Sequence, residues 1–66
     1  MQLEVDQEAD ALYFRLDDSQ IIDSEEVSSG IIIDYNENDE VAGIEILNLS
    51  NRTSIPNLKE LKFKSA

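Results

Sequence analysis

The fold expected of this chain is decided by residues 30–49, which read GIIIDYNENDEVAGIEILNL. Two runs rich in β-branched residues, at 31–35 and 41–47, flank a loop of Asn, Asp and Glu. β-Branched residues favour strands, whereas Asn and Asp are common in turns. The stretch therefore predicts two antiparallel strands joined by a polar loop.

Upstream of this hairpin, alternation of apolar and polar residues predicts strands at 2–5 and 11–16, separated by a polar turn at 6–10. Residues 21–27 mix apolar and acidic side chains on both faces. An edge strand tolerates such a mixture, because its charges oppose aggregation. Since consecutive strands tend to be neighbours, the prediction is a mainly β (α+β) fold, an antiparallel β-meander of about five short strands with a short C-terminal helix.

The helix is predicted after Asn51, where the pattern changes. Ser54 is a suitable N-cap, and Pro56 falls in the first turn, where its missing N–H costs nothing. Apolar residues then recur every three positions, at Ile55, Leu58 and Leu61. The alternative is a last strand, because apolar residues and lysines alternate over residues 61–64. We favour the short helix.

The chain is expected to form a single small domain over residues 1–66. Sixty-six residues lie near the lower limit for a fold with its own core, and the absence of cysteine excludes a disulfide framework. Small scaffolds without such cross-links often gain stability by associating, so we expect a homodimer. The start of the sequence resembles no signal peptide, and the longest apolar run is far too short for a membrane helix. A cytoplasmic location without membrane contact is therefore expected.

The formal charge of −10 is distributed unevenly. Residues 1–51 carry 14 acidic side chains against Arg15 alone, whereas residues 52–66 carry four basic side chains against Glu60. An acidic body repels phosphate, which argues against nucleic-acid binding. The basic tail could contact the acidic body of its own or a neighbouring subunit, or it could simply be solvated.

No catalytic or cofactor-binding residue is assigned. The chain has no His and no Cys, which removes the commonest general base and the most readily activated nucleophile. The serines lie in predicted turns or flanking segments, and the numerous carboxylates show no pairing in a cleft. We therefore expect a protein that is not an enzyme and needs no cofactor.

One carboxylate spacing resembles a calcium-binding loop. Asp34, Asn36, Asn38 and Glu45 occupy the first, third, fifth and twelfth positions of an EF-hand register. The sixth position should be Gly but is Asp39, and the flanking segments are predicted strands rather than helices. A polar hairpin loop explains the same residues, so no metal site is assigned and these four side chains stay weak candidates for a cation.

The acids of the first turn and the two tyrosines are further candidates for a functional role. Three acids in the first turn could share a cation, but they are expected to solvate that turn, with Asp6 or Asp10 accepting backbone N–H groups. The tyrosines at 13 and 35 could mark an interaction surface, because aromatic side chains with a polar tip suit half-buried positions. Tyr13 and Tyr35 could equally lie at the edge of the core.

The order of several blocks resembles a known family. The blocks are residues 8–16, 26–27, 30–35 and 41–48, followed by Ser50, and together they resemble the DUF2283 family of small, mainly prokaryotic proteins of unknown function. The resemblance covers about residues 4–52 and leaves the tail of about residues 53–66 outside. Family members usually carry an Asp-Gly-type turn where this chain has residues 38–40, so this loop is expected to be longer or differently shaped.

The resemblance implies a small, β-rich, bacterial, cytoplasmic and self-associating domain, without catalytic residues to carry over. Some relatives accompany small toxin-like proteins. The leading hypothesis is a non-enzymatic protein-interaction module. The alternatives are an antitoxin-like inhibitor of a small basic partner and a weak cation-binding protein.

Overall fold

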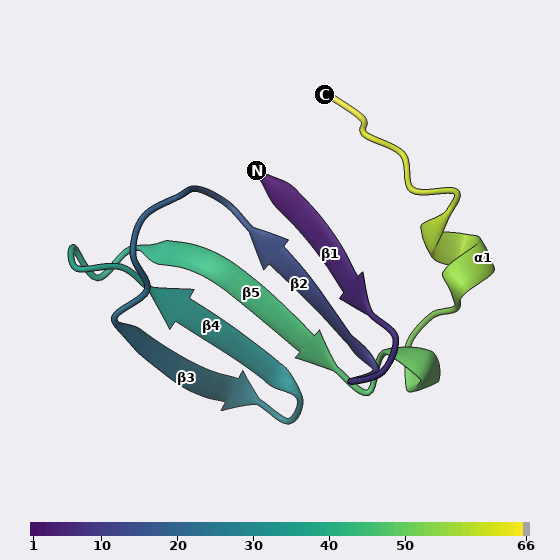
Figure 1. The fold of residues 1–66 in the computed structure, drawn as a ribbon, viewed down its shortest axis with the longest axis horizontal. Helices are drawn as coiled ribbons and strands as arrows, with labels where there is room; N and C mark the ends of the chain where they lie inside the picture. The colour runs from purple at the N-terminus through teal and green to yellow at the C-terminus, as the bar shows by residue number, and fades with distance from the viewer. Residues whose placement is uncertain (66) are drawn as a thin grey trace.

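A computed structural model describes residues 1–65 as one five-stranded sheet followed by two short helical segments (Figure 1). The elements are β1 (Gln2–Asp6), β2 (Ala11–Arg15), β3 (Asp23–Ser28), β4 (Ile31–Tyr35), β5 (Val41–Leu47), the 3-10 turn η1 (Leu49–Asn51) and α1 (Ile55–Leu58). All strand pairs are antiparallel. The predicted mainly β class, with five antiparallel strands and a short helix, is confirmed.

The strand order β1-β2-β5-β4-β3 corrects the predicted simple meander. β5 lies in the centre of the sheet, between β2 and β4, while β3 forms an edge (Figure 1). The composition of the strands explains this order. β5 is the longest strand and contains buried Ala42 and Gly43, whereas every residue of β3 is exposed and three of its six residues are acidic. The prediction that residues 21–27 supply an edge strand is confirmed.

The connection between β2 and β3 follows from this order, since it must pass β5 and β4 to reach the edge of the sheet. The Arg15 guanidinium donates hydrogen bonds to the backbone carbonyls of Asp17 and Ser19, which fixes the start of the crossing. The Asp17 carboxylate accepts hydrogen bonds from the Ser19 hydroxyl and the Ser19 N–H, and these lower the pKa of Asp17.

The turn between β3 and β4 requires glycine. Gly30 has a φ of +76°, and a Cβ atom there would lie 2.9 Å from Nη2 of Arg52. Arg52 occupies this position because its side chain donates hydrogen bonds to the carbonyls of Leu47 and Ser29. The arginine thereby ties the end of β5 to the turn that precedes β4.

α1 confirms the predicted helix start but is shorter than the apolar spacing suggested. Ser54 is the N-cap, and its hydroxyl accepts a hydrogen bond from the Asn57 N–H at 3.3 Å. The helix ends at Leu58, and Leu61 lies beyond it with 65% of its surface exposed. Residues 61–65 form neither helix nor strand, so the alternative of a last strand is wrong.

The strand register places most of the large apolar residues on one face of the sheet. Leu3 pairs with Phe14, Phe14 with Ile44, and Ile44 with Ile33, so apolar side chains cross four strands in a row. No second layer covers this row within residues 1–65, because α1 has only four residues and lies at one end of the sheet (Figure 1). In that part of the chain no large side chain is fully buried.

Candidate interaction surface

The main candidate surface is this apolar face, which we define by eight side chains. They are Leu3, Val5, Leu12, Phe14, Ile31, Ile33, Ile44 and Ile46, and the pairing places all of them on the same side of the sheet. Leu3 is 37% exposed, and the other seven are half-buried. Side chains of this type are normally found inside a folded domain.

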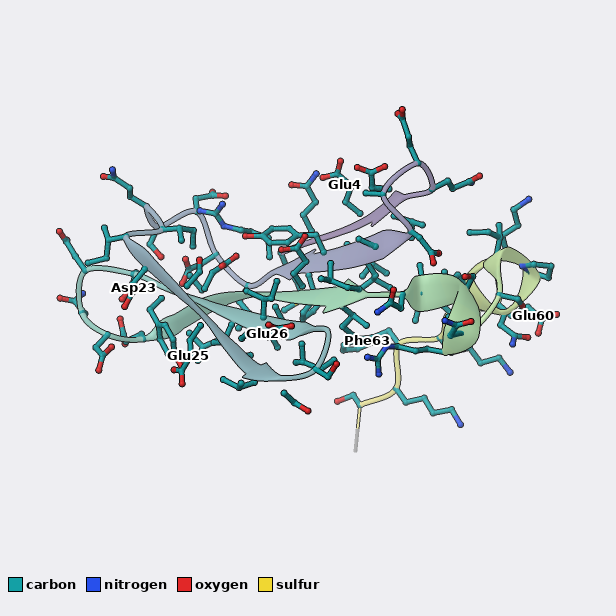
Figure 2. All side chains as sticks on the ribbon, turned by 90° about the horizontal axis from the view of Figure 1, so that it is seen from below. Glu4, Asp23, Glu25, Glu26, Glu60 and Phe63 are labelled. Atoms are coloured by element: carbon teal, nitrogen blue, oxygen red, sulfur yellow. The ribbon has the colours of Figure 1, made fainter. Side chains whose placement is uncertain are left out.

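Acidic residues border the apolar face along β3. Asp23 pairs with Tyr35 and Glu25 pairs with Ile33, so both carboxylates lie on the apolar side. Figure 2 shows Asp23 and Glu25 on one side of the sheet and Glu4 on the other. We call Asp23 and Glu25 the acidic edge.

The total accessible surface is large for a chain of this mass. It amounts to 5148 Å² for 7.5 kDa, whereas the usual scaling for folded monomers gives about 4,200 Å². The exposed tail and the open face of a single-layer sheet both contribute to the excess. Domains normally bury such a face against a second layer, so this sheet has an unsatisfied surface.

The opposite face carries a hydrogen-bonded network across three strands. The Tyr13 hydroxyl of β2 donates to Oδ2 of Asp34 at 2.8 Å, and the Ser24 hydroxyl of β3 donates to Oδ1 at 2.5 Å. Asp34, on β4, is only 8% exposed, and each of its two carboxylate oxygens accepts one of these bonds. We call this the tyrosine–aspartate network; it satisfies a nearly buried carboxylate without a cation.

Gly43 of β5 makes room for the network. A Cβ atom at this position would lie 2.7 Å from the Tyr13 hydroxyl oxygen, 3.1 Å from its Cζ and 3.3 Å from Oδ2 of Asp34. The tyrosine ring therefore crosses the central strand at the one position that has no side chain. Partial burial and the hydrogen bond to Asp34 raise the pKa of Tyr13.

The two tyrosines singled out in the sequence lie on opposite faces. Tyr13 belongs to the network, and its hydroxyl is already bonded inside the molecule. Tyr35 borders the apolar face, where its hydroxyl lies 3.4 Å from Oε2 of Glu25. Partial burial and the negative charge of Glu25 raise the pKa of Tyr35.

The residues of the calcium-like spacing are spread over two strands and a loop. Asp34 is bonded to Tyr13 and Ser24, and Oδ1 of Asn36 accepts the backbone N–H groups of Asn38 and Glu40 at 2.9 and 3.0 Å. Glu45 lies opposite Tyr13 in the register, away from the loop. Among residues 1–65, no three acidic side chains are grouped so that they could hold a metal ion.

Asn36 instead organises the loop that lacks the usual glycine. It is 5% exposed, and its side-chain amide also donates to Glu40 and Ser19. Asp39 adopts the left-handed conformation with a φ of 60°. As expected from the missing glycine, the reversal is a wider loop, and the Asn36 side chain fixes its shape.

The first turn has the predicted role for Asp6 and a different one for Asp10. Oδ1 of Asp6 accepts the Ala9 N–H at 3.0 Å, as predicted for a turn-forming carboxylate. Asp10 accepts both the N–H and the hydroxyl of Ser50, at 2.9 and 2.8 Å, and thereby attaches η1 to the first hairpin. A hollow of about 390 Å³ lies beside this contact, lined by Val5 and α1 residues among others.

The comparison with family models gives one match. The model described as "Protein of unknown function (DUF2283)" matches residues 2–50, which is most of the chain. The chain belongs to the DUF2283 family. No curated protein and no solved structure matches it. Among residues 1–65 no helix is long and apolar enough to cross a membrane.

The DUF2283 match includes the whole sheet and ends within η1, so α1 and the basic tail lie outside it. The matched part contains the whole apolar face and the whole network. Sequence reasoning did not find the roles of Ser24 and Gly43. The glycine could have indicated space for the Tyr13 ring, because Gly43 on β5 lies two residues from the partner of Tyr13 on β2. That relation can be recognised only once β2 and β5 are known to be neighbours.

Proposed function

We propose that this DUF2283 protein is a non-enzymatic, cytoplasmic protein-interaction module that binds another polypeptide through its apolar face. The single observation behind the proposal is that eight large apolar side chains line one face of a sheet that no other element of residues 1–65 covers. Each large side chain that becomes fully buried contributes about 1.5–3 kcal/mol. A partner surface on this face supplies the second layer that a single sheet lacks.

The polar face supports the same proposal because its nearly buried carboxylate is occupied within the chain. Both oxygens of Asp34 accept hydrogen bonds, and the Tyr13 hydroxyl that donates one of them has its pKa raised, not lowered. A catalytic nucleophile needs the opposite adjustment. The network is therefore best understood as structural support that holds four strands in register beneath the binding face.

Site-resolved hydroxyl-radical labelling tests the proposal. The purified protein is labelled at low concentration, at high concentration, and with an extract of its own cells added. We expect labelling of Phe14 and Ile33 to fall in at least one of the latter two samples. Ile32 supplies the matched control, because it is the neighbour of Ile33 on β4 but lies on the polar face. Unchanged labelling of Phe14 and Ile33 in every sample would contradict the proposal.

A further inference from the structure

We infer that the occupant of the apolar face is a second copy of this chain. The two sheets stack face to face with β1 of each copy over β3 of the other, so that the basic tail of one copy lies on the acidic edge of its partner. This inference rests on the proposed function, and it adds the identity of the partner and the orientation of the complex. The basic tail here means residues 59–65, which contain Lys59, Lys62 and Lys64.

The size of the face fits a dimer of this kind. The molecule measures 36 × 29 × 20 Å including α1 and the tail beside the sheet, so one broad side of the whole molecule projects to on the order of 1,000 Å², of which the sheet forms the larger part. Stable complexes bury about 800 Å² on each partner. The surface of the chain exceeds the value expected for its mass by about the same amount, and stacking two identical faces removes from both copies the part of that excess that the open face contributes.

The two-fold axis of such a dimer must lie between the sheets, because both apolar faces have to point inward. An axis parallel to the strands places β1 of one copy over β3 of the other. An axis perpendicular to the strands places β1 over β1 and β3 over β3. Contacts between apolar side chains do not separate these two arrangements, but the charged residues at the borders do.

The charges favour the axis parallel to the strands. The tail runs outside β1 toward the beginning of that strand (Figure 1), and β3 also begins at that end of the sheet, with the acidic edge. The parallel axis therefore brings Lys62 and Lys64 of each copy to Asp23 and Glu25 of the other. The perpendicular axis places acidic edge on acidic edge, which is repulsive.

The tail is positioned for a contact between copies rather than within one. Figure 2 shows Phe63 on the same side of the sheet as Asp23 and Glu25. Phe63 is nevertheless 93% exposed, so it does not pack on its own apolar face. An apolar side chain between two lysines suits the border of a partner's sheet, where an apolar face meets two carboxylates.

Zero-length crosslinking of the native protein tests both parts of the inference. Equal amounts of ¹⁵N-labelled and unlabelled chain are mixed and treated with a carbodiimide, which joins a lysine amine to a carboxylate. We expect a light-scattering mass of twice 7.5 kDa, together with mixed-isotope peptides that join Lys62 or Lys64 to Asp23 or Glu25. Mixed-isotope peptides arise only between chains.

Charge reversal provides the second measurement. The pair Lys62→Glu with Lys64→Glu should weaken the dimer about tenfold, because attraction at both ends of the interface becomes repulsion. The pair Asp23→Lys with Glu25→Lys should weaken it similarly. Mixing the two variants should restore a wild-type dissociation constant to within threefold, because the acidic tail of one chain then meets the basic edge of the other and the basic tail meets the acidic edge. Combining all four changes in one chain should restore it in the same way.

The outcomes separate this inference from the proposed function. A dimer without crosslinks between tail and acidic edge, or without rescue by the combined charge reversal, would overturn the inferred orientation. A monomer whose apolar face is protected only when cell extract is added would overturn the second copy as occupant and leave the proposed function intact. A monomer whose face is labelled freely in every sample would overturn both.

Discussion

The two faces of this sheet differ in where their side chains find partners. On the polar face Asp34 is nearly buried, yet both of its oxygens accept hydrogen bonds from Tyr13 and Ser24 of the same chain. On the apolar face, large aliphatic and aromatic side chains remain partly exposed, because residues 1–65 provide no layer to cover them. A single-layer sheet can satisfy its polar groups internally, but it cannot bury its apolar groups alone.

The largest effect should come from making the apolar face polar. We expect Ile33→Gln combined with Ile44→Gln to raise the dissociation constant of the complex at least a hundredfold, since each buried side chain contributes about 1.5–3 kcal/mol and each 1.4 kcal/mol is a factor of ten. Sedimentation over a concentration series measures this. Ile32→Gln changes the same residue type on the other face and should leave association within threefold. An equal effect of the two variants would remove the distinction between the faces.

A smaller effect should follow from filling the space at Gly43. In Gly43→Ala the new methyl group meets the Tyr13 hydroxyl and ring, so the tyrosine must move and its bond to Asp34 weakens. Overpacking of this kind costs roughly 1–3 kcal/mol of unfolding free energy. Urea denaturation at a fixed protein concentration measures the cost.

A double-mutant cycle supplies the control for Gly43→Ala. In a Tyr13→Phe background the closest contact is absent, so the same substitution should cost less than half as much. Equal costs in the two backgrounds would mean that Gly43 is required for a reason other than space for the tyrosine.

The sequence carried enough information to predict the strands but not their order. Alternation identified the strands, and the acids at 23, 25 and 26 predicted an edge. It could not place β5 between β2 and β4, because the preference for consecutive neighbours describes only the commonest connection. The network was hidden for the same reason, since Tyr13, Ser24 and Asp34 come from three strands that only the correct order brings together.

The calcium-like spacing contains residues that the fold uses in separate places. Asp34 and Asn36 have the expected oxygen atoms, but β4 ends at Tyr35, so Asp34 lies in the sheet while Asn36 already belongs to the loop. Asp34 thus joins the network, and Asn36 turns its amide oxygen to backbone N–H groups of its own loop. In an EF-hand loop the first and third residues bind the same ion, whereas Asp34 and Asn36 have separate structural roles here.

The smallest effect separates the polar face into its hydroxyl and its ring. Tyr13→Phe keeps the ring over Gly43 but removes the donor to Asp34, which should cost about 1–2 kcal/mol near pH 7. Partial burial and Asp34 raise the pKa of Tyr13, so the folded chain holds this proton more tightly than the unfolded chain. The stabilisation is therefore complete below about pH 10, the ordinary tyrosine pKa, and is lost as the pH rises through the raised value. The difference in unfolding free energy between wild type and Tyr13→Phe should stay constant from about pH 6 to 9 and narrow above about pH 10.

Urea unfolding from pH 6 to above pH 10 measures this difference, with absorbance at the phenolate band as an independent titration. Tyr35→Phe is the control on the apolar side, because its hydroxyl contact is longer and its removal should cost less at neutral pH. If the Tyr13→Phe difference persisted unchanged through the alkaline range, the hydroxyl would contribute through packing rather than through the proton that it shares with Asp34.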